Sequence, residues 1–142
     1  MFLLDTNVVS ELRKAGDKRA DPNVMAWLST ASSASFYISS ITLWEVEIGI
    51  LRMERRDAPR GAQLRKWMIY QLMPQFSDRI LPIDAAIALR CAGLHVPFTR
   101  PDNDAWIAAT ALVHNMTVVT RNVADFEPTG VRLLNPWDSR LL

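Results

Sequence analysis

The sequence lacks the features that mark secreted and membrane-bound proteins. Only one of its 142 residues is a cysteine, Cys91, so the chain cannot form an intramolecular disulfide. No apolar run reaches the roughly 18 residues that a membrane-spanning helix needs. No charged segment followed by a long apolar stretch marks a signal peptide. We therefore expect a cytoplasmic protein with no membrane contact.

The chain also lacks an excess of one charge. Its formal net charge is +1, whereas general nucleic-acid binders are strongly basic. Its two histidines, His95 and His114, are too far apart to form a metal-binding motif. Basic residues do gather in two regions, and each is either a phosphate-binding surface or an ordinary solvated helix face. These are Arg13, Lys14, Lys18 and Arg19 early in the chain, then Arg52, Arg55, Arg56, Arg60, Arg65 and Lys66.

What is present is an alternation of short apolar runs and amphipathic segments. With no internal repeat, low-complexity stretch or linker, residues 1–142 are expected to form a single domain. The alternation predicts an α/β sandwich with a mainly parallel sheet. Strands are predicted at 2–4, 36–39, 80–83, 117–120 and 131–136. Helices are predicted over 6–13, from 22, over 42–55, over 60–72 (ended with the help of Pro74), from 85 to before Pro97, and over 105–114.

Acidic residues follow several of these strands. Asp5 comes directly after the first strand, where ligands gather in open α/β sheets. It is also a good N-cap for the next helix, so both interpretations of Asp5 stand. Glu45 lies early in the helix after the second strand, Asp104 in the first turn of an alanine-rich helix, and Asp125 just past the strand at 117–120. In a parallel sheet these residues can converge on one edge.

Clustered carboxylates repel one another unless a cation neutralises them. Oxygen ligands without histidine or cysteine favour Mg²⁺ or Mn²⁺ over zinc. Such an ion can activate water for phosphodiester hydrolysis. Each acid also has a structural interpretation: Asp104 can stabilise a helix N-terminus, Glu45 and Asp125 can be surface residues, and Asp102 can cap the alanine-rich helix.

Four motifs in this order resemble those of the PIN-domain ribonucleases. They are MFLLDTN at 1–7, SSITLWEVEIG at 39–49, DAWIAATAL at 104–112 and VTRNVADF at 119–126. The resemblance runs essentially from end to end. It is strongest to the VapC-type toxins of type II toxin–antitoxin systems, in the FitB-like branch.

The resemblance implies a three-layer α/β/α fold and an acidic pocket that holds Mg²⁺ or Mn²⁺. By motif, Asp5, Glu45 and Asp104 occupy the family's three main acidic positions. Many PIN domains carry a fourth Asp where this chain has Asn122, and the nearest carboxylate here is Asp125. The fourth position is therefore open. The residues that resemble those orienting the carboxylates are Thr6, Asn7, Thr120 and Asn122.

The resemblance also implies an activity and partners. The expected reaction is metal-dependent endoribonuclease cleavage of structured RNA, such as tRNA or rRNA loops, leaving 3′-hydroxyl and 5′-phosphate ends. The expected partner is a VapB- or FitA-like antitoxin. Its C-terminal segment would cover the acidic groove and its N-terminal part would bind DNA. A homodimer is also expected.

Two other functions compete with this one. Phosphotransfer domains also place Asp after the first strand. However, the phosphatase type needs a second Asp where this chain has Asn7, and the receiver type needs a lysine that residues 115–142 lack. The second alternative is a catalytically inactive PIN domain that only binds RNA or a protein partner.

Overall fold

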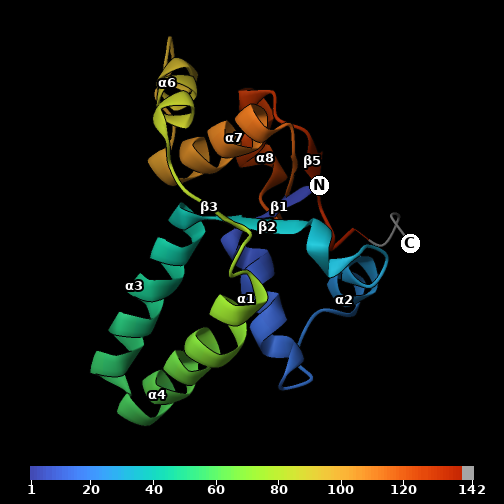
Figure 1. The fold of residues 1–142 in the computed structure, drawn as a ribbon, viewed down its shortest axis with the longest axis vertical. Helices are drawn as coiled ribbons and strands as arrows, with labels where there is room; N and C mark the ends of the chain where they lie inside the picture. The colour runs from blue at the N-terminus through green and yellow to red at the C-terminus, as the bar shows by residue number, and fades with distance from the viewer. Residues whose placement is uncertain (139–142) are drawn as a thin grey trace.

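The centre of the fold is a sheet of five parallel strands in the order β3-β2-β1-β4-β5 (Figure 1). The computed structural model describes residues 1–138. The predicted parallel α/β architecture is confirmed, and β1 occupies the middle of the sheet. The strands are β1 (Phe2–Leu4), β2 (Phe36–Ser39), β3 (Ile80–Leu81), β4 (Thr117–Val119) and β5 (Leu133–Leu134).

Neighbouring residues of the central strands point into two different cores. Leu3 and Val118 pack on one face of the sheet, and Leu4 and Val119 pack on the other. All four are fully buried, so these strands are apolar on both sides, as in a sheet covered by helices. This alternation produces three layers.

Helices cover each face, as Figure 1 shows. The core on one face is shared by α6 (Ala85–Leu94), α7 (Asp102–His114) and α8 (Val123–Phe126). The other core is shared by α1 (Thr6–Ala15), α2 (Pro22–Leu28), α3 (Ser40–Arg56) and α4 (Ala58–Trp67), with the π-turn η2 (Met68–Leu72). The short α5 (Met73–Gln75) leads to Phe76 of the same core. Two 3₁₀ turns, η1 (Ser33–Ser35) and η3 (Glu127–Thr129), complete the chain. No helix in the described part of the chain is long and apolar enough to cross a membrane.

Several boundaries differ from the prediction, among them the last strand, which spans Leu133–Leu134 and not 131–136. The helix predicted over 60–72 begins earlier, at Ala58, and Pro74 does not end it. The π-turn η2 offsets the hydrogen-bond ladder by one residue, and Pro74 then lies in the first turn of α5, where its missing N–H is tolerated. The strand β3 ends at Leu81 because Pro82 cannot donate to a ladder. Pro101, not Asp102, is the N-cap of α7.

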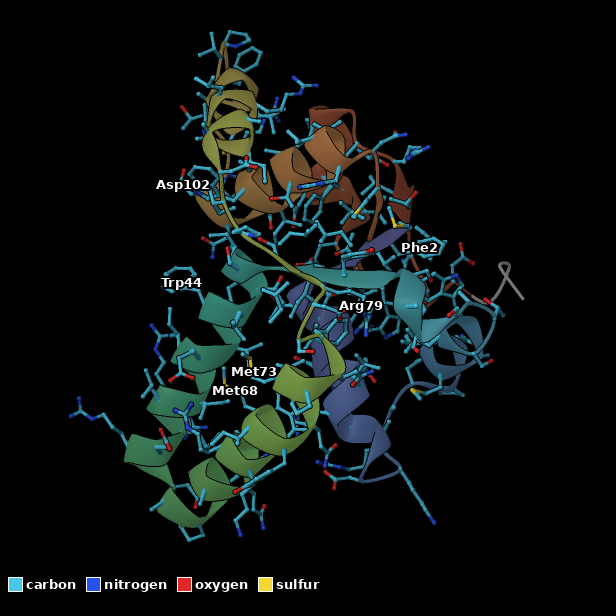
Figure 2. The ribbon with its side chains drawn as sticks, in the orientation of Figure 1. Phe2, Trp44, Met68, Met73, Arg79 and Asp102 are labelled. Carbon is cyan, nitrogen blue, oxygen red and sulfur yellow. The ribbon has the colours of Figure 1, made fainter. Side chains whose placement is uncertain are left out.

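Arg79 ties the segment before β3 to the start of β2. Its guanidinium donates to the carbonyl oxygens of Ser33 and Phe36 at 2.6 and 2.5 Å, and also to that of Gln75. Figure 2 shows Arg79 beside the sheet, between β2 and the end of the α4–α5 segment. This link fixes where the α3–α4 hairpin returns to the sheet.

The α3–α4 hairpin depends on a close contact at Gly61. A Cβ atom on Gly61 would lie 2.5 Å from the Cα of Glu54, so only glycine fits between the two helices. A Cβ on Gly49, in the middle of α3, would meet nothing within 4 Å.

We therefore predict opposite effects for two Gly→Ala substitutions. Gly61→Ala should lower the free energy of unfolding by about 1–3 kcal/mol, because it overpacks the hairpin. Gly49→Ala should raise it by about 0.5–1 kcal/mol, because alanine is the better helix former. Urea titrations of both variants test this. Equal effects would mean that α3 and α4 do not pack as described.

Candidate functional site

The site is built at the carboxyl end of β1, where Asp5 leaves the sheet. The Asp5 N–H still donates to the Val119 carbonyl at 3.0 Å, so β4 holds the residue in place. Its side chain is 5% exposed and caps α1: Oδ1 accepts from the Thr6 N–H at 2.8 Å. The N-cap prediction for Asp5 is thus confirmed, yet only one of its two carboxylate oxygens is used as the cap.

The other oxygen of Asp5 is oriented from β4. Thr120, fully buried, donates its hydroxyl to Oδ2 at 2.7 Å. The same hydroxyl accepts from the Asn122 N–H at 3.0 Å and from the Asn7 side-chain amide at 3.3 Å. One donor and two acceptor positions are then all in use, which leaves the Thr120 hydroxyl no freedom to turn. Asn7 adds a longer bond to Asp5 Oδ2, at 3.4 Å.

Thr6 links Asp5 to Glu45 beside the carboxyl ends of β1 and β2. Its N–H binds Asp5, and its hydroxyl donates to Glu45 Oε1 at 2.8 Å. Glu45 is half-buried in the second turn of α3, and its Oε2 accepts from the Asn103 amide at 3.4 Å. Three elements that lie far apart in the sequence are therefore joined through Glu45.

The charges of Asp104 and Asp125 act on the carboxylates of the same site. Burial raises the pKa of Asp104 to about 6, with further contributions from the negative charges of Asp5, Asp125 and Glu45. Burial also raises the pKa of Asp5, against the hydrogen bonds from Thr120 and Thr6. The pKa of Glu45 is raised by burial and by Asp5. Repulsion among the four acids is thus part of the folded state.

We call Asp5, Glu45, Asp104 and Asp125 the acidic site. Hydrogen bonds bring Asp5, Glu45 and the start of α7 together at one edge of the sheet, as predicted, and the roles of the four acids stay a prediction. Asp125 is exposed on α8 and affects both Asp5 and Asp104, whereas Asn122 contributes its backbone N–H to Thr120.

One residue of the site was not predicted, namely Asn103. It lies in the run Asp-Asn-Asp that begins α7, and its role as a donor to Glu45 depends on a contact between α3 and α7. The only signal in the sequence was its position one residue before Asp104.

The donor chemistry of the acidic site suits a hard divalent cation. All four side chains offer oxygen. Burial, with the neighbouring negative charges, raises the pKa of Asp5 and Asp104, and a bound cation would oppose this shift. Within residues 1–138, no three His, Cys, Asp or Glu side chains are close enough to form a ready-made metal-binding group. The acids interact through charge without closing into a coordination shell.

Comparison with known proteins places this geometry in a family. A model of the PIN domain matches residues 2–127. The chain belongs to the PIN-domain family. It is 33% identical to the VapC ribonuclease Y4jK of Sinorhizobium fredii, over 97% of this chain and 99% of the relative. It is also 33% identical to toxin FitB of Neisseria gonorrhoeae, over 96% and 99%.

A solved PIN-domain structure has the same fold. The structure of FitAB bound to the IR36 DNA fragment aligns with a TM-score of 0.86 at 33% identity, over 97% of this chain and 96% of that one. The three-layer α/β/α arrangement implied by the sequence motifs is thereby confirmed for this PIN domain.

The raised pKa of Asp104 predicts how stability depends on pH. In the folded state the pKa of Asp104 is about 6, above its usual value. At a pH between the usual pKa and 6, the folded state therefore binds more protons than the unfolded state. Without metal, Asp104→Asn should therefore be more stable than the wild type at pH 8, and this advantage should shrink as the pH falls below about 6.

Thermal unfolding in EDTA across this pH range measures the difference. Asp78→Asn is the matched control, because Asp78 is 86% exposed and precedes β3, at the opposite edge of the sheet from the acidic site. A constant difference between Asp104→Asn and the wild type at all pH values would contradict the proposed repulsion.

Proposed function

We propose that this PIN domain, residues 1–142, is a metal-dependent endoribonuclease that acts as the toxin of a type II toxin–antitoxin pair. The observation that carries the proposal is the acidic site, in which one buried carboxylate, Asp5, and its less buried neighbours act on one another at one edge of the sheet. The relatives named as a ribonuclease and a toxin support it over nearly the whole chain.

Asp5 and Asp104 are the side chains that we expect to hold Mg²⁺ or Mn²⁺ directly, with Glu45 beside them. Such an ion supplies charge neutralisation at the scissile phosphate and activation of a water molecule. Asp5 is best positioned for this role, because one of its oxygens is fixed by the α1 N-terminus and the other by Thr120. Asp125 is exposed and could contribute a further charge through water.

The surrounding residues orient the carboxylates. Thr120 and Asn7 fix the rotation of Asp5, and Thr6 fixes its spacing from Glu45. Asn122 holds the Thr120 hydroxyl through its backbone N–H. Such supporting hydrogen bonds typically affect metal affinity or activity by roughly 10–100-fold.

The proposed substrate is structured RNA with an exposed loop, such as tRNA or rRNA, in the bacterial cytoplasm. The proposed partner is an antitoxin with a DNA-binding N-terminal part, because the structural relative FitAB is a complex bound to DNA. We also propose that the toxin forms a homodimer.

The test of this function is cleavage of total cellular RNA by the purified protein, freed of antitoxin. Discrete fragments should appear with Mg²⁺ or Mn²⁺ and be absent with EDTA. Asp5→Asn and Asp104→Asn should each reduce the rate by at least about a hundredfold, because they remove charge that holds the ion.

The matched control is Asp78→Asn, which removes a carboxylate far from the acidic site and should cleave as the wild type does. Cleavage by Asp5→Asn at the wild-type rate would contradict the proposal. Tight RNA binding by the folded wild type without any cleavage would instead support an inactive binding module.

Thr120→Val tests the positioning role separately. Valine keeps the shape of threonine but removes the hydroxyl that donates to buried Asp5. Activity should fall about 10–100-fold, and the Mn²⁺ concentration for half-maximal rate should rise. Thr110→Val is the control, because Thr110 is equally buried but donates within α7, to the Trp106 carbonyl. If both variants respond alike, Thr120 acts only through packing.

A further inference from the structure

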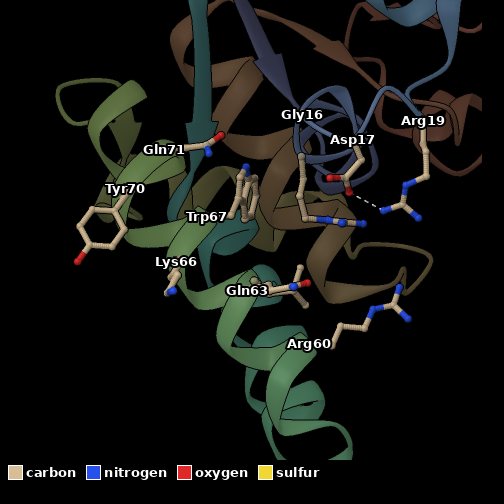
Figure 3. A pocket seen from close by; sticks show the side chains of 11 residues that line it. Gly16, Asp17, Arg19, Arg60, Gln63, Lys66, Trp67, Tyr70 and Gln71 are labelled. Atoms are coloured by element: carbon tan, nitrogen blue, oxygen red, sulfur yellow. Dashed lines mark hydrogen bonds and ion pairs between the residues drawn. The ribbon is translucent and has the colours of Figure 1, made fainter.

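A basic trough lies between the end of α1 and the face of α4 and η2. Its volume is about 470 Å³, the larger of the hollows beside these helices. Figure 3 shows Arg60 and Arg19 at one end of the trough and Tyr70 at the other, with Trp67 on the wall between them. We define the basic trough by its four cations and two aromatics: Arg13, Arg19, Arg60, Lys66, Trp67 and Tyr70.

The charges of the trough are not balanced. Asp17 is the one acidic residue among those that line it, and it pairs with Arg19 at 2.7 Å. Within the described residues, Arg13, Arg60 and Lys66 form no ion pair. Three cations that converge on one hollow without acidic partners favour an anionic occupant.

The structure separates these cations from other basic residues on the same helices. Arg65, adjacent to Lys66, is bound to Glu47 at 2.6 Å and to Glu54 at 3.0 Å, so its charge is used within the α3–α4 hairpin. Arg52 and Arg55 lie on α3 and do not line the trough. Of the second basic region of the sequence, only Arg60 and Lys66 therefore line the trough.

A second hollow lies between the trough and the Glu45 side of the acidic site. This hollow of about 210 Å³ shares Arg13, Leu64 and Trp67 with the trough, and Thr6 and Glu45 line it as well. Gly49 also lines this second hollow, and nothing lies within 4 Å of its Cβ position. A chain that left the acidic site along α1 would reach the trough next.

The aromatic residues give the trough a second recognition chemistry. Tyr70 is 74% exposed at the rim, and Trp67 is partly exposed in the wall. Exposed rings beside a basic groove are the pattern of single-stranded nucleic-acid binding, where bases stack and phosphates meet cations. A protein segment would bind to three unpaired cations less strongly than RNA would, unless the segment were acidic.

We propose that the basic trough binds the single-stranded RNA that flanks the scissile phosphate. Arg13, Arg60 and Lys66 receive its phosphates, and Tyr70 stacks on a base. This inference rests on the proposed nuclease function and adds the direction in which the substrate leaves the acidic site, along α1 and α4.

The test is fluorescence anisotropy with a short labelled single-stranded RNA of mixed sequence. All proteins carry Asp5→Asn, so that the RNA stays intact. Arg60→Gln combined with Lys66→Gln should weaken binding about tenfold or more at low salt. The slope of log affinity against log salt should become shallower by about 1.4, since each phosphate contact in single-stranded RNA contributes about 0.7.

The matched control is Arg52→Gln combined with Arg55→Gln, which removes the same charge from exposed positions of α3 outside the trough. Its affinity and slope should stay close to those of the parent. Tyr70→Ala should weaken binding about tenfold at every salt concentration with no change of slope, because stacking releases no counterions. Equal behaviour of the two double variants would overturn the proposal.

Cleavage and inhibition assays distinguish the remaining outcomes. If the trough double variant, with Asp5 restored, cleaves RNA normally but escapes inhibition by the cognate antitoxin, the occupant is an antitoxin segment and the proposal is overturned. If the wild type cleaves no RNA while the binding slopes still separate, the nuclease function fails but the trough still binds RNA.

Discussion

The hydrogen bond from Thr120 to buried Asp5 is the contact around which the site is organised. It joins the ends of two adjacent parallel strands, and it holds a carboxylate that burial alone would favour in the neutral form. The N-terminus of α1 stabilises the same carboxylate from the other side. Because β1 is the central strand, β2 and β4 bring α3 and the loop before α8 to the same edge. The sheet topology therefore decides where the acids meet.

The acidic site is strained by charge in the absence of a cation. Asp104 has a pKa of about 6 because burial and three neighbouring acids oppose its ionisation. Hydrogen bonds from Thr6 and Asn103 offset part of this cost at Glu45. The repulsion between ionised acids lowers the free energy of unfolding. A cation bound among them would offset this loss. We regard this electrostatic conflict as the physical basis of the metal dependence that we propose.

Much of this could be predicted from sequence because the signals are local. A short apolar run followed by Asp5 predicted both the central strand and a residue at its carboxyl end. Glu45, Asp104 and Asp125 each followed a predicted strand or opened a predicted helix. The N-cap role of Asp5 could not be separated from a role in the site, since the structure shows that one carboxylate has a separate oxygen for each contact.

The features that escaped prediction depend on packing between distant segments. Asn103 reaches Glu45 only because α7 lies against α3. Glu47 pairs with Arg65 across the α3–α4 hairpin, a contact between two helices that no local motif predicts. The basic trough likewise forms only where the end of α1 meets α4, so charge counts along the chain could not separate Arg60 from Arg65.

The most direct test of the central claim is calorimetric titration of Mn²⁺ into the metal-free protein at pH 6 and at pH 8. The account predicts saturable binding that requires both Asp5 and Asp104. It also predicts proton release at pH 6, where Asp104 is partly protonated, and little release at pH 8. Binding of equal strength to Asp5→Asn and Asp104→Asn, or no binding at either pH, would contradict the claim that these carboxylates form a cation site.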